Sequence, residues 1–258
     1  MKQAVILAAG FGSRLARHDG DIKPLRQVEG ASLIRRNLLL LEACGVDECI
    51  IIVGYRGAEL QEAIESENCD LQMPVRFVFN PHYHKSNGIS VLSAQPYIKG
   101  AFVLLMADHI FDQAIVEDAV RIDPPEDGAI LCIDYKIDKV FDIDDATKVM
   151  TDGQRVLQIS KQLIEYNAID TGIFMCSPAL FDALQTARQA SANDDCSLSA
   201  GVAALLTRDR MMVHDVGSAL WQDVDTELTL KHAERLLRKR LIDRSLGALA
   251  RTRLNVAL

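Results

Sequence analysis

The chain has 258 residues, of which 49% are apolar and 25% charged, and its formal charge at pH 7 is −8. This charge argues against general binding to nucleic acids or anionic membranes, but it is compatible with a local basic pocket. No apolar run approaches the ~20 residues of a membrane-spanning helix. The first strand begins too early to leave room for a signal peptide, and the six cysteines form no C-x-x-C pair. We therefore expect a cytoplasmic protein with reduced cysteines.

The strand predicted over residues 4–7 leads into the most informative motif, LAAGFGSRL at residues 7–15, and Lys23-Pro24 follows it. Its two glycines let the backbone approach a ligand and present N–H groups to it. Arg14 and Lys23 add positive charge nearby. A strand, a glycine-rich turn and basic side chains together predict a site for a polyanion such as a triphosphate.

The same residues exclude two commoner phosphate-binding motifs. A G-x-G-x-x-G fingerprint would need glycine where Leu15 stands, and no G-x-x-x-x-G-K-[ST] string occurs. A turn without function is the remaining alternative, but it requires neither Arg14 nor Lys23.

Apolar runs of strand length alternate with segments of helical period through the first half of the chain. Strands are predicted over residues 48–53, 75–80, 102–107 and 129–135, and helices over residues 32–44, 58–67 and 112–121. This alternation predicts a mainly parallel sheet covered on both faces. Ligands of such sheets bind at the carboxyl ends of the strands, where the glycine-rich turn and Asp108 both lie.

Three carboxylates are candidate metal ligands. Asp108 ends a buried strand, with His109 beside it to tune the carboxylate, and Mg²⁺ prefers carboxylate and phosphate oxygens. Asp223 and Asp225 alternate along one extended segment, so both point to the same side and one can reach the cleft that Asp108 faces. Capping of a helix N-terminus is the alternative for each of these residues.

The second half of the chain is less regular. A hairpin around Asp152-Gly153 is expected to join two strands, and Pro178 is expected to open a helix. Further strands are predicted over residues 171–176 and 211–216, and helices over residues 197–207 and 226–242. One domain is therefore expected over residues 1–242. Residues 243–258 are expected to form a separate tail. This tail would be a frayed end, a contact in an oligomer or the stub of a longer fusion.

Single polar residues give weaker signals. Asn80, Gly88 and Ser90 lie where they could read a base or ribose edge, although a turn with a serine cap explains them equally well. Lys148 and Lys161 are each suited to neutralise an incoming phosphate, and a solvated surface lysine is the alternative for both.

Taken together, these strings resemble the CTP:inositol-1-phosphate cytidylyltransferases over residues 5–237. The matching strings include LAAGFGSRL, KPL, SNGIS, MADHIF, ATKV, IDTGIF and WQDVDT. The resemblance implies an α/β, Rossmann-like nucleotidyltransferase fold with a mainly parallel mixed sheet and helices on both faces. It also implies Mg²⁺ as cofactor, with CTP and a small phosphorylated or phosphonate acceptor as partners.

The resemblance also assigns roles to residues by position. It implies catalytic roles for Arg14, Lys23 and Lys148, with Lys148 on the acceptor's phosphate, and metal ligation by Asp108 and Asp225. Nucleotide binding falls to Leu7, Ala8, Ala9, Gly10, Gly12, Ser13, Asn80, Gly88 and Ser90. Acceptor binding falls to Lys161, Tyr166, Asp170 and Thr171.

Two alternatives remain open at this point. One is a cytidylyltransferase for phosphocholine or an aminoalkylphosphonate, because Tyr83, Tyr166 and the acidic residues 142–145 could form a pocket for a cation. The other is a nucleotide-sensing protein without catalysis. The oligomeric state, including a homodimer, is also left open.

Overall fold

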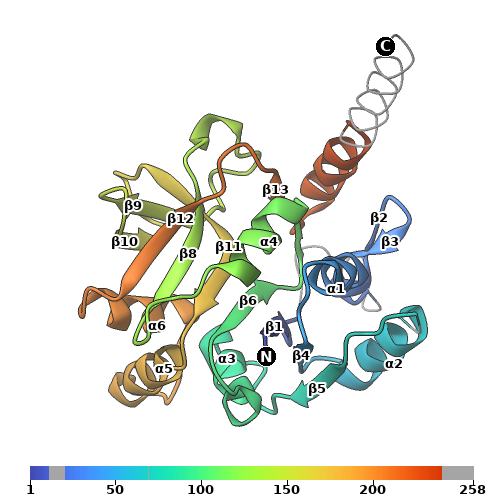
Figure 1. Cartoon of the computed structure of the whole chain (residues 1–258), viewed down its shortest axis with the longest axis horizontal. Helices are drawn as coiled ribbons and strands as arrows, with labels where there is room; N and C mark the ends of the chain where they lie inside the picture. The colour runs from blue at the N-terminus through green and yellow to red at the C-terminus, as the bar shows by residue number, and fades with distance from the viewer. Residues whose placement is uncertain (12–20, 69, 240–258) are drawn as a thin grey trace, which may run out of the picture.

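The computed structural model describes residues 1–11, 21–68 and 70–239 (Figure 1). Three predicted site residues, Gly12, Ser13 and Arg14, lie outside the described residues, and so does the predicted tail over residues 243–258. Among the described helices, none combines the length and the apolar character needed to cross a membrane.

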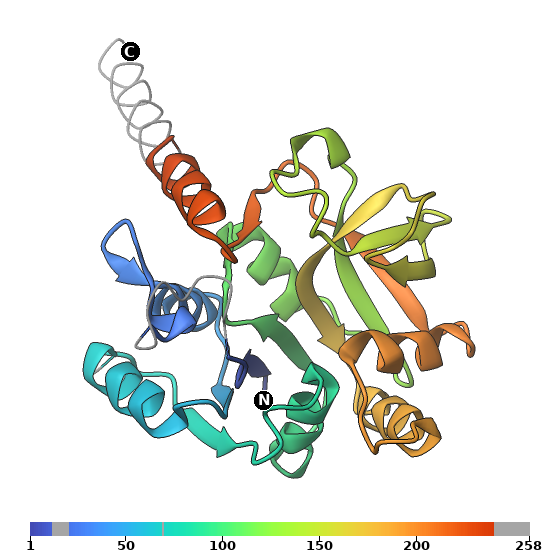
Figure 2. The ribbon, with the colours of Figure 1, turned by 180° about the vertical axis from the view of Figure 1, so that it is seen from behind.

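Nine of the described strands form one mixed sheet (Figures 1 and 2), with the path β10-β9-β11-β6-β1-β4-β5, β8 beside β11, and β12 beside β8. The strands are β1 (Gln3–Ala8), β4 (Glu48–Val53), β5 (Val75–Phe79), β6 (Phe102–Met106), β8 (Ala129–Asp134), β9 (Lys148–Thr151), β10 (Val156–Ser160), β11 (Ala168–Cys176) and β12 (Met211–Asp215). The half formed by β5, β4, β1 and β6 is parallel, whereas β11 runs antiparallel to β6, β8 and β9.

Helices cover both faces of the sheet, as predicted. One face carries α1 (Leu33–Ala43), α2 (Gly57–Glu67) and α4 (Gln113–Arg121), and the other carries α3 (Asn87–Ala94), α5 (Ala179–Ala190) and α6 (Leu198–Leu206). Because side chains alternate along a strand, Ile6 of β1 packs in the core with α1 while Val5 packs in the core with α3. The predicted α/β architecture is confirmed.

Several short elements complete the edge of the sheet at which β1 and β6 end. They are the paired strands β2 (Gln27–Val28) and β3 (Ala31–Ser32), the paired strands β7 (His109–Phe111) and β13 (Trp221–Asp223), and the 3-10 helices η1 (Lys23–Leu25) and η3 (Ile137–Lys139). A further 3-10 helix, η2 (Gln95–Tyr97), lies at the opposite edge, beside the start of β1. The β7–β13 pair was not predicted from the sequence. It holds the segment after Asp108 beside the segment that carries Asp223 and Asp225.

The predicted hairpin is present as β9 and β10, and residues 227–239 are helical, within the predicted final helix. Strand β11 differs from its prediction, because it begins at Ala168 rather than at residue 171. Its register against β8 shifts between Asp170 and Phe174, and Gly172 between them has φ of +84°. Only glycine adopts this conformation without strain, so the irregularity explains the glycine of the D-T-G string.

Candidate active site

One cavity, the β1 cavity, lies at the carboxyl end of β1 and has a volume of about 450 Å³. Its walls are the end of β1, η1, residues 83–90 and the residues that follow β6. Five of the predicted nucleotide-binding residues line it, namely Leu7, Ala8, Ala9, Gly10 and Ser90. Pockets for small ligands have volumes of roughly 300–1,000 Å³, so the β1 cavity has the size for a nucleotide.

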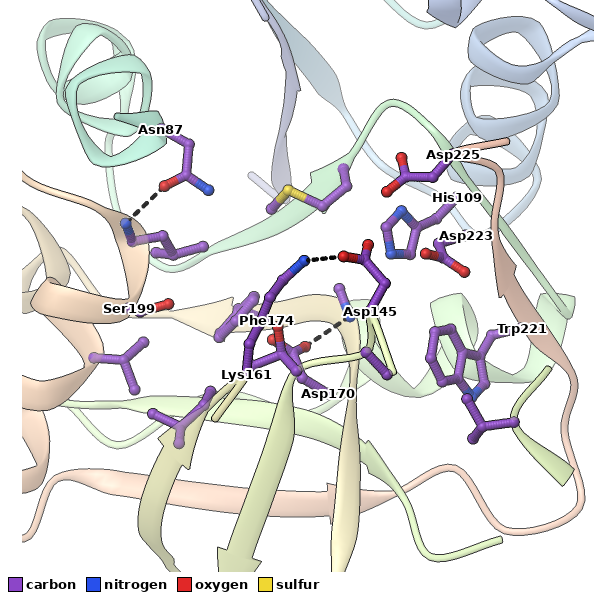
Figure 3. Close-up of a pocket in the computed structure, with 18 residues that line it drawn as sticks. Asn87, His109, Asp145, Lys161, Asp170, Phe174, Ser199, Trp221, Asp223 and Asp225 are labelled. Carbon is purple, nitrogen blue, oxygen red and sulfur yellow. Dashed lines mark hydrogen bonds and ion pairs between the residues drawn. The ribbon is translucent and has the colours of Figure 1, made fainter. Parts of the chain in front are cut away.

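A second cavity, the β11 cavity, has a volume of about 170 Å³ and lies between β11, β13, the end of β10 and residues 140–147 (Figure 3). Two of the predicted acceptor-binding residues, Lys161 and Asp170, line it. Asn87, Met106 and Asp225 line both cavities. The two cavities therefore adjoin, with an Asp225 carboxylate at their junction.

Lys23 joins the two predicted metal ligands. Its Nζ lies 2.5 Å from Oδ2 of Asp108 and forms a second ion pair with Oδ1 of Asp225. Burial lowers the pKa of Lys23, but the two carboxylates outweigh it and raise the pKa above its ordinary value. The sequence separation between Lys23 and Asp225 is about two hundred residues, so only the fold brings these three groups together.

Asp108 and His109 form a second contact at this point. Nδ1 of His109 lies 2.7 Å from Oδ1 of Asp108. Burial raises the pKa of Asp108, but the Lys23 ammonium and the His109 hydrogen bond outweigh it and hold the pKa well below its usual range. Asp108 is therefore an ionised carboxylate at neutral pH, and the Nδ1–H group of His109 donates to it.

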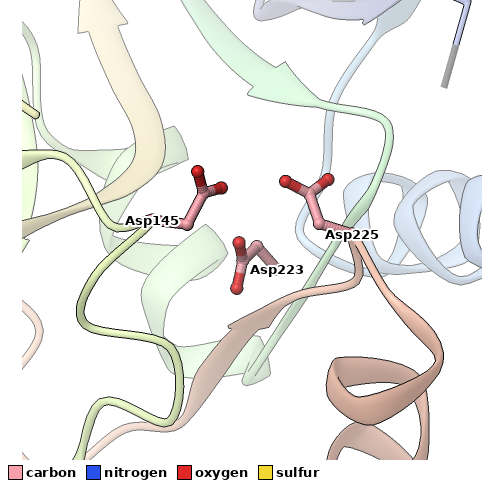
Figure 4. Close-up of side chains that lie close together, drawn as sticks. All are labelled: Asp145, Asp223 and Asp225. Atoms are coloured by element: carbon pink, nitrogen blue, oxygen red, sulfur yellow. The ribbon is translucent and has the colours of Figure 1, made fainter. Parts of the chain in front are cut away.

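An acidic group that the sequence did not single out as a unit lies beside this site (Figure 4). Asp145, Asp223 and Asp225 each bring one carboxylate oxygen within 4.8 Å of the others. Burial and the neighbouring carboxylates raise the pKa of Asp223, and Nζ of Lys161 lies 3.0 Å from Oδ1 of Asp145. Asp223 and Asp225 thus face the same side, as the alternation predicted, and Asp145 joins them from a distant loop.

Asp170 places a carboxylate at the floor of the β11 cavity (Figure 3). Its Oδ1 accepts a hydrogen bond from the backbone N–H of Gly172 at 2.7 Å. Burial raises the pKa of Asp170 to about 6, although that hydrogen bond lowers it. A carboxylate of this kind is a strong acceptor for the hydroxyl groups of a ligand.

Among the predicted site residues that the structure describes, five line neither cavity: Asn80, Gly88, Lys148, Tyr166 and Thr171. Lys148 is buried in β9, and its Nζ donates to the carbonyl oxygen of Asp144 at 3.0 Å. Thr171 is fully buried and donates to the carbonyl oxygen of Cys132. Tyr166 is half-buried on the segment before β11.

Asn80 and Gly88 instead support the wall of the β1 cavity. The Asn80 amide donates to Oγ of Ser90 at 3.0 Å, and so fixes a residue that lines the cavity. A Cβ atom at Gly88 would come within 2.5 Å of the carbonyl oxygen of Cys196. Glycine is therefore needed there for the packing of α3 against the chain before α6.

Sequence reasoning missed several residues that line the cavities. The acidic run 142–145 was a signal for Asp145, and Asn87 stands inside the SNGIS string. Lys85 had no motif; it lines the β1 cavity, and its Nζ donates to the carbonyl oxygen of Asp194 at 2.6 Å.

Known proteins resemble the chain in sequence and in fold. A family model described as the MobA-like NTP transferase domain matches residues 4–197. Relatives from Rubrobacter xylanophilus and Thermococcus kodakarensis, both named bifunctional IPC transferase and DIPP synthase, are 35% identical to the chain over 237 residues. These matches cover 91% and 92% of the chain but 51% and 50% of the relatives. The chain thus spans about half the length of these curated relatives.

A solved structure, that of the inositol-1-phosphate CTP transferase from T. maritima, has a TM-score of 0.78 to this chain and 27% sequence identity. The match covers 91% of this chain and 94% of that one.

Proposed function

The chain belongs to the family of MobA-like NTP transferase domains, and from this premise we propose that it is a cytidylyltransferase. It transfers CMP from CTP to inositol 1-phosphate and releases pyrophosphate. The observation that carries the proposal is the junction of two cavities at Lys23, Asp108 and Asp225. The similar structure is that of an inositol-1-phosphate CTP transferase, which supports the choice of CTP and inositol phosphate.

The reaction is an in-line displacement at phosphorus. A phosphate oxygen of the acceptor attacks the α-phosphorus of CTP, one P–O bond forms, and the bond to the bridging oxygen of pyrophosphate breaks. The attacking oxygen is already an anion near neutral pH, so no side chain has to remove a proton. The chain's task is to hold two anions in line and to offset their repulsion, which is the usual basis of such catalysis.

The residues at the junction fit a divalent cation. Asp108 and Asp225 each place one carboxylate oxygen against the same ammonium group, so both oxygens already face the position of a small cation. Carboxylates of this kind suit Mg²⁺, which when bound neutralises the phosphate charge of the nucleotide. Asp108 and Asp225 would hold it, and Lys23 would then be released from the carboxylates toward the phosphates.

The β11 cavity supplies the groups that an acceptor such as inositol 1-phosphate needs. Lys161 lies at its rim with an ammonium group for the phosphate, and the Asp170 carboxylate lies inside it for hydroxyl groups. Lys161 fits this role better than Lys148, because the Lys148 ammonium is buried and donates to a carbonyl oxygen.

Free thiols on all five described cysteines support the expected cytoplasmic setting.

Pyrophosphate release from the four nucleoside triphosphates, each with Mg²⁺ and with inositol 1-phosphate, phosphocholine or 2-aminoethylphosphonate, tests the proposal. We expect CTP with inositol 1-phosphate to give the highest kcat/KM. A preference for UTP or dTTP would contradict the cytidylyl assignment. Faster turnover of phosphocholine or the aminophosphonate would instead replace the acceptor, and no turnover with any pair would favour the nucleotide-sensing alternative.

Lys161→Ala is expected to raise the KM for the acceptor phosphate by about tenfold or more, because a charge-assisted hydrogen bond contributes roughly 1.5–3 kcal/mol. The KM for CTP should change little. Lys148→Ala is the matched variant, and we expect it to alter the acceptor KM less. Steady-state kinetics with each substrate varied would measure both. A larger effect at Lys148 would restore it as the phosphate contact.

A further inference from the structure

His109 stands in the wall between the two cavities. Its neighbour in sequence, Asp108, lines the β1 cavity, whereas the imidazole of His109 lines the β11 cavity (Figure 3). The proposed mechanism needs no histidine as base, and the tuning of Asp108 that the sequence suggests uses only one nitrogen of this nearly buried ring. Its side chain is only 15% exposed, which makes chance placement a poor explanation.

The imidazole is held on several sides. It lies nearly parallel to the rings of Phe111, at 5.8 Å between centroids, and of Trp221, at 6.3 Å. The backbone of His109 is fixed as well, because its carbonyl oxygen accepts from the Asn37 amide and its strand pairs with Asp223. A ring held in this way keeps one orientation, which a group that only fills space does not require.

Gly172 shows how closely the wall is fitted to this ring. A Cβ atom at position 172 would lie 2.8 Å from Nε2 of His109. Only glycine at position 172 therefore lets the backbone of β11 approach the edge of the ring this closely. The irregularity of β11 thus makes room for the imidazole at the acceptor side.

The two ring nitrogens differ in their contacts. Nδ1 donates to Oδ1 of Asp108 at 2.7 Å. Among the hydrogen bonds of the described residues, none involves Nε2, and the ring lines the β11 cavity. No fully buried side-chain nitrogen or oxygen of the described residues lacks a partner, so Nε2 keeps some accessible surface. Nδ1 thus binds a residue of the nucleotide side, and Nε2 is available to a ligand on the acceptor side.

We propose that His109 is a positioning residue that acts on both sides of the junction. Through Nδ1 it orients the Asp108 carboxylate toward the metal and nucleotide, and through Nε2 it binds an oxygen of the acceptor. This inference rests on the proposed function, because it takes the β11 cavity as the acceptor site. It makes one side chain responsible for the alignment of donor and acceptor.

Two amide variants separate the two contacts. The side-chain nitrogen of asparagine reaches about as far as Nδ1 of histidine, and that of glutamine about as far as Nε2. His109→Asn is expected to keep the orientation of Asp108 and lose the acceptor contact. His109→Gln is expected to do the reverse, and His109→Phe should lose both while keeping the ring stack.

Binding measurements report on the metal side and on the acceptor side separately, without turnover. For the metal side, calorimetry would measure the affinity for CTP with Mn²⁺ and no acceptor. We expect wild-type affinity for His109→Asn and a loss of ~10–100-fold for His109→Gln and His109→Phe, as is typical when the partner of a metal ligand is removed. For the acceptor side, inositol 1-phosphate would be titrated in the presence of Mg²⁺ and the unreactive donor analogue α,β-methylene-CTP. There we expect His109→Gln to bind the acceptor with nearly wild-type affinity, and His109→Asn and His109→Phe to bind it about tenfold more weakly.

The crossed pattern is what a merely structural role cannot produce. If His109→Asn and His109→Gln behave alike in both titrations while their melting temperatures match that of the wild type, the inference is wrong. If the wild type binds CTP but takes phosphocholine in place of inositol phosphate, the proposed acceptor fails, and the second titration is repeated with phosphocholine. If the wild type binds none of the acceptors, the acceptor half of the inference fails with the proposed function, while the metal-side comparison still decides the other half.

Discussion

Lys23→Ala is expected to lower turnover by about 10²–10³-fold, the usual cost of removing one electrostatic contact to a developing charge. The same change should also lower thermal stability when no divalent cation is present. Asp108 and Asp225 share the Lys23 ammonium, and without it two carboxylates converge in a poorly solvated site. Removing one partner from a buried ion pair destabilises proteins by roughly 3–5 kcal/mol. Because all three groups retain some solvent contact, we expect the lower end of that range or less.

Two measurements separate these effects. Single-turnover kinetics with saturating CTP would give the loss in the chemical step, and thermal melts with and without Mg²⁺ would give the loss in stability. We expect Mg²⁺ to restore much of the stability of the variant but none of its turnover. Lys231→Ala, at an exposed lysine of the final helix, is the control and should change neither. Near-normal turnover in Lys23→Ala would reduce Lys23 to a structural counter-ion.

Local patterns predicted the parallel half of the sheet closely. The strand predicted over residues 48–53 is β4 with the same bounds, because an isoleucine-rich run between turn signals has few alternatives. The strands β7 and β13 were not predicted, because each of them has only three residues. A run that short shows no periodicity, and its partner lies about 110 residues away along the chain.

The centre of the candidate site was predictable for a topological reason. The carboxyl ends of parallel strands meet at one edge of the sheet, so the turn after β1 and Asp108 after β6 had to be neighbours. The same logic does not choose between Lys148 and Lys161. Lys148 follows an acidic loop and ends up buried against the Asp144 carbonyl, whereas Lys161 lies past the end of its strand and reaches the cavity. Burial of this kind depends on the antiparallel half of the sheet, whose register no local pattern fixes.

Asp108→Asn and Asp225→Asn are each expected to weaken the affinity for Mg²⁺ or Mn²⁺ strongly, and turnover with it. The double variant should be little worse than either single variant. Two ligands of one ion act as a unit, so the loss of the second adds little once the first has destroyed the site. The structure supports this reasoning, because both carboxylates already bind one and the same ammonium group.

Asp223→Asn is the matched control for this series. Its carboxylate lies two residues from Asp225 and within the same acidic group, but no ion pair joins it to Lys23 among the described contacts. We therefore expect a smaller loss of metal affinity than at Asp225. Mn²⁺ binding by calorimetry and the Mg²⁺ dependence of kcat would measure all four proteins. Losses at 108 and 225 that add in free energy would mean that the two carboxylates do separate work, with Asp225 serving the start of the final helix. An effect at Asp223 as large as that at Asp225 would move the metal toward Asp145, because these three carboxylates converge beside the acceptor cavity.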